Sequence, residues 1–577
     1  MSLIDYFTKD LKPRQKQYEA IRAVAFREGD LDEVALRFGY TPQSLRTLIN
    51  RLERGRHVLF PEVKRGPKGR HTSDEVAKLI AELRRKRRLN AREITRELKR
   101  LRISIGTRTV ERILTEAGFP RLRRRTHCER GISKRGTLIP QRSANLDIKG
   151  LEPFQEVCQV AGVFLFLPYI LESGILDIIQ QCSLPESRDI GNQQAALSML
   201  LLKLIGQERL SHINQYDTDR GLGLFAGLNV LPKPTYMCSY SCRTNSAGLM
   251  AFQSKLVAYL RQVYPELYTG KTINLDFHSI PHFGTESEME KVWCGARGKT
   301  LKGANTFFAQ DGESDSIIYT RADIKRSESS EEIKNFVNYW LGIKGIVDET
   351  LVFDSKLTRY GILYELDEEN VKFITLRKRS NKLIQETLKI PEKEWEKVYL
   401  PIPKRKHKHV KVFQNRVELV RGKKTFRQAI IKGHGRAEPT FIISNNEEMK
   451  LLDLLVVYAH RWHIENKLSE LVNFFSLNAF SSPIMVRIHF DILWTVVADT
   501  LYHLFAQDLR RFEKCRAPKI FKRFIDAPGQ IKYDGDRFTV KIRKRATTPI
   551  ILGVEKLNKE FQVPWLDNKP LKVIWTP

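Results

Sequence analysis

The spacing of apolar and polar residues divides the chain into regions with different periods. Near the N-terminus, apolar residues recur every three to four positions in short segments, which predicts two groups of three short helices, within residues 15–52 and 72–116. Between residues 151 and 268 the apolar segments become long and carry little charge, as in 195–205 and 249–263. We expect this third region to form a helical domain.

The period shortens from residue 271 onward, where short apolar and alternating segments predict strands. The expected strands are residues 272–280, 304–310, 316–321, 351–354 and 371–376, and the expected helices are 330–342 and 358–366. The resulting order is β-β-β-α-β-α-β. Such an order favours a mixed sheet with helices packed on it.

A second strand-rich region follows at residues 383–445. Its stretch from Lys404 to Arg436 holds twelve Lys or Arg residues and one acid, Glu418. Apolar residues alternate with these charges, which predicts antiparallel hairpins with one basic face. Helices are then expected at 447–477 and 501–512, and a β-hairpin with loops at 537–577.

The two N-terminal groups of helices share a plan that is typical of helix-turn-helix modules. In the first, Gly39 forms a turn, and Thr41 with Pro42 opens the last helix. In the second, the expected caps are Asn90 and Thr107. Two plain helical hairpins remain the alternative interpretation. The candidate DNA contacts are the basic residues of the last helices and of the link between the groups, namely Arg46, Lys64, Arg65, Lys68, Arg70, Arg108 and Arg112.

Charge supports a nucleic-acid partner. The 577 residues include 98 Lys and Arg against 67 Asp and Glu, a net charge of +31. Residues 1–150 hold 37 of these basic residues and only 18 of the acids. A protein this basic usually binds a polyanion. The alternative is a basic surface that contacts only solvent. This N-terminal region is therefore the strongest candidate for binding DNA.

Composition also excludes several classes of protein. A chain of this length with 42% hydrophobic residues can bury several cores. Its seven cysteines are scattered, which favours a reducing compartment over a disulfide framework. The longest apolar run, residues 160–171, is about half of a membrane span. We expect no membrane partner, no signal peptide and a cytoplasmic location.

Two aspartates lie at positions in the predicted sheet where catalytic or metal-binding side chains are commonly found. In residues 272–278, Ile273, Leu275 and Phe277 alternate with the polar residues, so that Asp276 faces away from them. Asp354 ends a fully apolar strand, and the carboxyl ends of central strands are where open sheets place their sites. Two aspartates on neighbouring strands could bind Mg²⁺. Each alone could equally be a turn or cap residue.

A helical segment supplies a third acid. Tyr458, Arg461 and Glu465 are three and four residues apart, so they share one face of the expected helix. A glutamate can bind a hard cation while tyrosine and arginine hold a phosphate oxygen. This stripe could therefore place a metal ligand beside phosphate contacts.

Taken together, Asp276, Asp354 and Glu465 resemble the acidic triad of DDE transposases with an RNase H-like fold. The segment Leu351 to Ser355, the segment Phe373 to Arg379 and a β-rich region before the glutamate are similar to the group found in bacterial insertion sequences. That group carries a Tyr-Arg-Glu-Lys signature, which Tyr458, Arg461 and Glu465 match. The last signature position falls on Val472 instead of Lys, so this chain lacks the lysine that would make the last phosphate contact of the signature.

The resemblance implies a multidomain α+β protein with an RNase H-like catalytic domain. The expected divisions are helix-turn-helix domains at 1–60 and 71–125, basic linkers at 61–70 and 126–150, a helical domain at 151–268, a catalytic α/β domain at 269–380 and 446–480, a β-rich basic insertion at 381–445, and a C-terminal helical and hairpin region at 481–577.

The resemblance also implies an activity. Asp276, Asp354 and Glu465 would hold two Mg²⁺ ions, for which Mn²⁺ could substitute, and catalyse DNA cleavage and strand transfer in cut-and-paste transposition. Tyr458 and Arg461 would grip the DNA backbone. The expected partners are terminal inverted repeats, target DNA and a second copy of the chain, in a bacterial cytoplasm close to the nucleoid. Two alternatives stay open: a domesticated, non-catalytic DNA-binding regulator, and an RNase H-like DNA nuclease without strand transfer.

Overall fold

The computed structural model describes residues 12–60, 72–87, 89–119, 144, 146–182, 184–283, 289–294, 297–322, 324–403, 405–436, 438–479 and 484–577. The chain divides into two compact units, Met1–Leu138 and Ile139–Pro577. The basic segment with Lys64, Arg65, Lys68 and Arg70 lies outside the described residues.

The first unit contains two small helical groups at the places that the apolar period predicts. The first group comprises α2 (Pro13–Ala25), α3 (Leu31–Arg37) and α4 (Pro42–Glu53). The second comprises α5 (Asp74–Arg87), α6 (Ala91–Arg100) and α7 (Thr107–Glu116). Each group surrounds its own small apolar core, one including Ala20, Val34 and Leu45, the other including Ile94 and Val110.

Helix caps explain where these elements begin. The Thr41 hydroxyl accepts a hydrogen bond from the N–H of Ser44 at 3.2 Å, and the Asn90 side chain accepts one from Glu93 N–H at 3.0 Å. These bonds satisfy backbone donors that a helix start leaves open. The cap predicted at Thr107 is wrong, because Gly106 is the cap and Thr107 is already the first helical residue.

A mixed sheet dominates the second unit. Its first strands are β2 (Thr272–Pro281), β3 (Lys291–Cys294), β4 (Lys299–Asp311), β5 (Ile317–Arg321), β6 (Thr350–Phe353) and β7 (Phe373–Leu376). Strands β3, β4 and β5 make antiparallel pairs, and β4 also pairs antiparallel with β2. Strands β2, β6 and β7 run parallel. The mixed α/β class inferred from the element order is confirmed.

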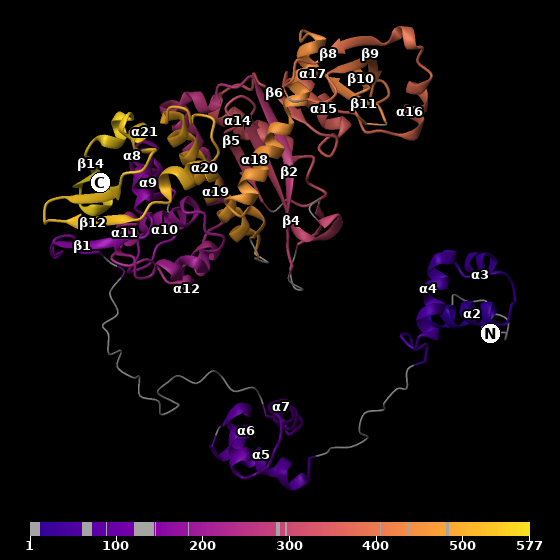
Figure 1. The fold of residues 1–577 in the computed structure, drawn as a ribbon, viewed down its shortest axis with the longest axis horizontal. Coiled ribbons are helices and arrows are strands. Elements are labelled where there is room, and N and C mark those ends of the chain that lie inside the picture. The colour runs from indigo at the N-terminus through magenta and orange to yellow at the C-terminus, as the bar shows by residue number, and fades with distance from the viewer. Residues whose placement is uncertain are drawn as a thin grey trace. The chain divides into compact units, whose positions relative to one another are not determined.

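The basic strand-rich region continues this sheet. Its strands are β8 (Glu396–Tyr399), β9 (His409–Glu418), β10 (Thr425–Lys432) and β11 (Thr440–Ser444). They pair antiparallel with one another, and β11 pairs with β7, placing Ile442 opposite Leu376. Within the described residues, one ten-stranded sheet therefore runs through both regions (Figure 1).

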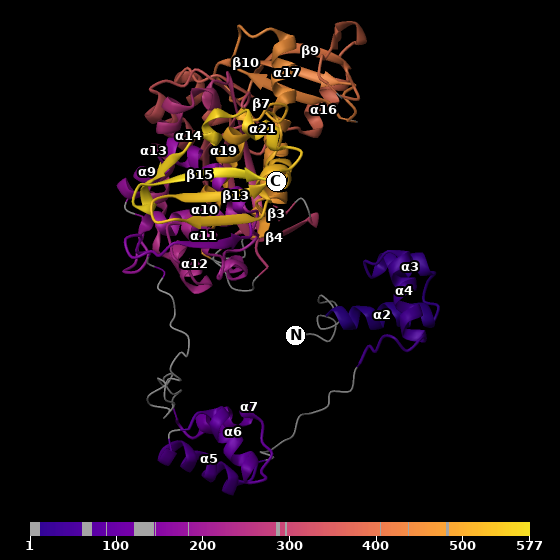
Figure 2. The same cartoon turned by 60° about the vertical axis from the view of Figure 1, so that its left-hand side comes forward.

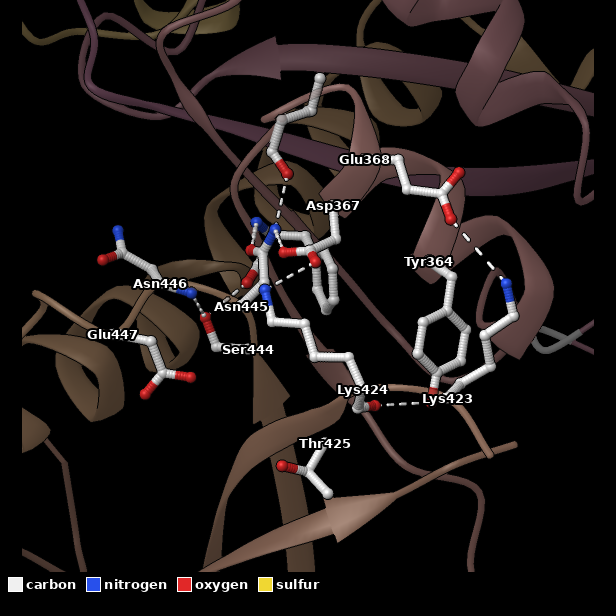
Figure 3. A network of polar contacts seen from close by, with 12 residues as sticks. Tyr364, Asp367, Glu368, Lys423, Lys424, Thr425, Ser444, Asn445, Asn446 and Glu447 are labelled. Carbon is white, nitrogen blue, oxygen red and sulfur yellow. Dashed lines mark hydrogen bonds and ion pairs between the residues drawn. The ribbon is translucent and has the colours of Figure 1, made fainter. Parts of the chain in front are cut away.

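Polar side chains fasten the junction between β7 and β11 (Figure 3). Asn445 accepts a hydrogen bond from the N–H of Phe373 at 2.8 Å and donates to the carbonyl of Val371 at 2.9 Å. The Lys424 amine lies 2.8 Å from an Asp367 carboxylate oxygen, which ties the β9–β10 turn to the end of α15 (Tyr360–Glu368). Because Asn445 is buried, these bonds have little competition from water.

The sheet separates two apolar cores. Leu351 and Phe353 contribute to the large core on one face. Val352, Ile374 and Ile442 contribute to a smaller core on the other, where they pack with Leu454 and Leu455 of α17 (Leu451–His460). The face of β6 that carries Val352 is thus the face covered by α17.

The predicted helix at 447–477 is two helices in the structure. After α17 the chain turns at Arg461 and continues as α18 (Trp462–Asn473). Figure 1 shows α18 beside β2. The predicted helix at 501–512 is the end of a longer one, α19 (Met485–Asp508), which is buried along most of its length.

The second unit contains further α-helices within its described residues. The helices are α8 (Leu167–Glu172), α9 (Ile175–Gln181), α10 (Asn192–Leu204), α11 (Arg220–Phe225), α12 (Pro234–Tyr240), α13 (Ser246–Val263), α14 (Glu332–Lys344), α16 (Asn381–Leu388), α20 (Ala517–Ile520), α21 (Thr548–Leu552) and α22 (Glu555–Asn558). No single helix of the described residues is long and apolar enough to cross a membrane, although the bent pair Ala161–Glu172 and Ile175–Gln181 meets the length and composition test jointly.

A second sheet joins distant parts of the chain. It contains β1 (Phe154–Cys158), β12 (Gly529–Tyr533), β13 (Phe538–Arg543), β14 (Phe561–Val563) and β15 (Lys569–Thr576). Strand β1 pairs with β12, and β13 lies parallel to β15 (Figure 2). The start of the region predicted to be helical is therefore a strand, since it pairs with a segment close to the other end of the chain.

Candidate active site

Strand register brings the two aspartates together. Strands β2 and β6 are parallel, and Leu275 is paired with Phe353. The next residue on each strand is Asp276 and Asp354, respectively. Neighbouring strands lie about 4.8 Å apart, and residues of the same register point to the same face. The two carboxylates therefore stand side by side, on the face that α17 covers.

The electrostatics of Asp276 reflect this neighbour. Burial raises the pKa of Asp276 to about 7, and the negative charge of Asp354 adds to the rise. The positive charge of Arg461 opposes it. Two carboxylates that are partly buried and repel each other are stabilised in their ionised form by a cation that binds both. The pair thus has the oxygen donors and the charge that a divalent cation requires.

Helices α17 and α18 add the remaining predicted residues on the same face. An Arg461 guanidinium nitrogen, Nη1, lies 3.8 Å from Asp276 Oδ2, and Nη2 lies 2.5 Å from Glu465 Oε1. Tyr458 packs against the smaller core, and burial raises the pKa of Tyr458 to about 12. The structure thus brings Asp276, Arg461 and Glu465 into one cluster.

The third acid is the most exposed of the three. The Glu465 side chain is 56% exposed, while those of Asp276 and Arg461 are each 15% exposed. In the described parts of the chain, no group of three or more His, Cys, Asp or Glu side chains is arranged to hold a metal ion. Arg461 stands between Glu465 and Asp276 instead. Asp354 and Glu465 each act electrostatically on Asp276, but within the described residues the three acids do not form a preassembled metal cage.

Sequence reasoning missed Lys356. Its backbone N–H donates to Asp354 Oδ1 at 2.9 Å, and its amine lies 5.0 Å from the centre of the Phe277 ring. Burial lowers the pKa of Lys356, partly offset by attraction to Asp276 and Asp354. A second cation therefore faces the acid pair. The only signal in the sequence is a lysine two residues after the strand-ending aspartate.

The lysine expected at the end of the signature is absent from the cluster. Val472 occupies its position, and the nearby Lys467 is buried. The Lys467 amine lies 3.1 Å from both carboxylate oxygens of Asp499 and 3.7 Å from Glu470 Oε2. Lys467 is therefore engaged in an internal ion network and is not presented as a phosphate contact.

His278 shares the strand face of Asp276 but is also engaged internally. Its Nε2 lies 2.7 Å from Asn478 Oδ1. Burial lowers the pKa of His278 and so favours its neutral form. This histidine packs the carboxyl end of β2.

The basic residues predicted for the first unit lie on its surface. Arg46 of α4 and both Arg108 and Arg112 of α7 are exposed. Arg112 has one weak ion pair, 3.9 Å from Glu116. Their side chains are therefore accessible to a partner.

Acidic oxygen donors on adjacent parallel strands, with a glutamate from a covering helix, define a class of sites suited to hard divalent cations. The family model described as "Transposase DDE domain" matches residues 270–498, which include the whole cluster. Residues 270–498 therefore match the model of a transposase DDE domain.

The chain has low similarity to solved transposase structures. The piggyBac transposase synaptic complex with hairpin DNA is 12% identical, covers 63% of this chain and 78% of that chain, and has a TM-score of 0.37. The Mos1 transposase paired-end complex with the left transposon end is 9% identical over 63% and 78%, with a TM-score of 0.14. No curated protein matches the chain.

Proposed function

We propose that this protein is a cut-and-paste transposase, which binds the terminal inverted repeats of an insertion sequence and catalyses DNA cleavage and strand transfer. The observation that carries the proposal is the placement of Asp276 beside Asp354 within a transposase DDE domain. A regulator that had lost catalysis would have no need of this acid pair.

Strand order supports an RNase H-like core for this domain. In space the strands run β5, β4, β2, β6, β7, with the first three antiparallel and the last three parallel. The acids then lie at the carboxyl ends of the central parallel strands, where such sheets place their sites.

Mg²⁺ is the cofactor that suits the donors. Asp276, Asp354 and Glu465 offer only carboxylate oxygens, which Mg²⁺ and Mn²⁺ prefer. Two such ions, when bound, would activate the attacking water or 3′-hydroxyl and stabilise the leaving 3′ oxygen. Asp276 and Asp354 would hold them from the sheet, and Glu465 would close the site from α18.

The cations of the cluster have a role in binding substrate. Arg461 has a planar guanidinium suited to a phosphate oxygen, and Tyr458 lies on the preceding turn. Lys356 faces the same acids and would attract the scissile phosphate. Together they would hold the DNA backbone next to the carboxylates.

DNA recognition is assigned to the first unit. Each of its helical groups would act as a helix-turn-helix module, with Arg46 on α4 and Arg108 and Arg112 on α7 facing DNA. The basic segment from Lys64 to Arg70 would lie against the backbone between the two modules. Two element ends must be cut in one complex, which favours a homodimer on DNA.

The test uses the DNA that flanks the gene on both sides. The purified full-length chain is incubated with both flanking segments, a target plasmid and Mg²⁺ or Mn²⁺, and the products are sequenced. Cleavage at matched inverted ends and joining to the plasmid are expected. Cutting without joining would favour the nuclease, and binding without cutting would favour the regulator.

A further inference from the structure

Arg461 occupies the position between two of the three acids. Its Nη2 lies 2.5 Å from Glu465 Oε1, and its Nη1 lies 3.8 Å from Asp276 Oδ2. The side chains of Arg461 and Asp276 are only 15% exposed, so their attraction is weakly screened by water. One guanidinium therefore bridges a strand carboxylate and a helix carboxylate.

The bridge leaves Arg461 incompletely satisfied. Among the described residues, Nη1 is buried and has no hydrogen-bond partner. Its separation from Asp276 Oδ2 is too long for a hydrogen bond and gives electrostatic attraction only. An open donor on a partly buried cation is costly, and an anionic oxygen would satisfy it. The geometry therefore favours a second state in which Nη1 meets a phosphate.

A divalent cation and this guanidinium compete for the same oxygens. Mg²⁺ binds carboxylate oxygens at about 2.0–2.1 Å. With Arg461 Nη2 at 2.5 Å from Glu465, an ion on that oxygen would stand against a positive charge at contact distance. The two cations therefore exclude each other, and Arg461 must leave the acids before Glu465 can bind a metal.

We propose that Arg461 is a place-holding cation that couples metal binding to DNA binding. Without DNA, it bridges Glu465 and Asp276 and keeps the divalent cation out of the site. The backbone of bound DNA draws the guanidinium away, which releases both carboxylates for the divalent ion. The inference rests on the proposed function, because it takes DNA and a divalent cation as the ligands of this cluster.

The coupling has a defined sign. DNA raises the affinity for metal, and by thermodynamic linkage metal raises the affinity for DNA by the same factor. This coupling would prevent metal-dependent cleavage until a DNA backbone is bound in the site.

The experiment measures Mn²⁺ binding to the full-length chain by electron paramagnetic resonance, first without DNA. We expect Arg461→Ala to bind Mn²⁺ about tenfold more tightly than the wild type, within the usual range of coupling between sites. Arg461→Lys keeps the charge but is too short to bridge both acids, and is expected to lie between the two. An Arg461→Ala protein that binds Mn²⁺ no more tightly overturns the proposal.

A charge control separates the bridge from general electrostatics. Lys356→Ala also removes a cation near Asp276 and Asp354, yet no side-chain ion pair joins Lys356 to these acids in the described structure. Its gain in Mn²⁺ affinity is expected to be smaller than that of Arg461→Ala. Equal gains would show that any positive charge acts in this way and would overturn the proposal.

The second arm adds a duplex that contains the flanking DNA. It should tighten Mn²⁺ binding to the wild type and have little effect on Arg461→Ala. The variant Asp276→Asn distinguishes failure of the proposed function from failure of the role proposed for Arg461. If Asp276→Asn and the wild type bind Mn²⁺ equally with and without DNA, the metal site and the proposed function both fail. If Asp276→Asn weakens binding but Arg461→Ala does not tighten it, only the place-holding role fails.

Discussion

Asp276 and Asp354 occupy the same register on two parallel strands, each one residue beyond the paired Leu275 and Phe353. They are 78 positions apart in the sequence, and β2 and β6 bring them together. Their closeness accounts for part of the rise in the pKa of Asp276, and it is the basis of the first two predictions.

Removing one carboxylate of this pair should abolish cleavage. Asp276→Asn keeps the shape of the side chain but loses the charge that holds the cation. We expect the rate of DNA cleavage to fall by at least about a thousandfold, because a catalytic metal supplies several kcal/mol. Asp453→Asn, an exposed aspartate on α17, is the matched control. Single-turnover cleavage is the measurement, and normal cutting by Asp276→Asn would remove it from the site.

The pKa of Asp276 predicts how stability depends on pH without metal. Because this pKa is about 7 when folded and near 3.8 when unfolded, the folded state retains a proton that the unfolded state has lost. The free energy of unfolding of the wild type, relative to Asp276→Asn, should therefore fall as pH rises from 4 to 7 and level off above.

Comparing these two proteins cancels the other titrating groups. Thermal unfolding in a chelator across this pH range is the measurement. Mg²⁺ added in sufficient excess to compete with Arg461 should recover part of the loss above pH 7 in the wild type and leave Asp276→Asn unchanged. A pH-independent difference would show that Asp276 has an ordinary pKa.

Lys467 should contribute to stability and not to the DNA surface. Lys467→Met leaves Asp499 and Glu470 buried without their shared cation, which costs about 3–5 kcal/mol. The double variant Lys467→Met with Asp499→Leu should recover part of this loss. Lys559→Met, which removes an exposed partner of Glu555, is the control.

Tryptophan fluorescence in urea isolates this effect, since all seven tryptophans lie within residues 293–575 and therefore in the second unit. If Lys467→Met unfolds like the wild type but binds DNA more weakly, Lys467 is a DNA contact after all.

Arg108 should contribute to recognition of the terminal repeats. Arg108→Ala removes an exposed cation from the first turn of α7. We expect weaker binding, and a salt dependence whose slope falls by about one if the contact is to a phosphate. Arg100→Ala, an exposed arginine at the end of α6, is the matched control. A mobility-shift titration at several salt concentrations is the measurement, and equal slopes for all three proteins would contradict the assignment.

Much of the local structure was predictable from particular residues. The apolar period placed α2 to α7, and the cap expected at Thr41 is present. The strand from Thr272 begins where it was expected because its alternation is regular. The main error in the predicted secondary structure arose where pairing with a distant segment of the chain determines the element. The segment β1 is a strand only because β12 lies beside it. The cap expected at Thr107 was misplaced by one residue for a local reason, since the helix already includes Thr107 and Gly106 is its cap.

The sequence predicted which residues belong to the candidate site better than it predicted how they are arranged. Asp276, Arg461 and Glu465 do meet. Helical spacing placed Tyr458, Arg461 and Glu465 on one stripe, whereas the chain turns at Arg461. Lys356 could not be distinguished from any surface lysine, since its proximity to two acids depends on the loop after β6.

By itself, the sequence determined the local elements, the basic character of the N-terminal region and the set of acids that could bind a divalent ion. These follow from periodicity and composition, which are properties of short stretches of chain. Only the tertiary structure decided that β2 lies beside β6, that β11 extends the sheet from β7, that Lys467 is paired with Asp499, and that Arg461 stands between Asp276 and Glu465. Most of these depend on pairing between segments far apart in the chain, where many registers satisfy the same local pattern and packing selects one.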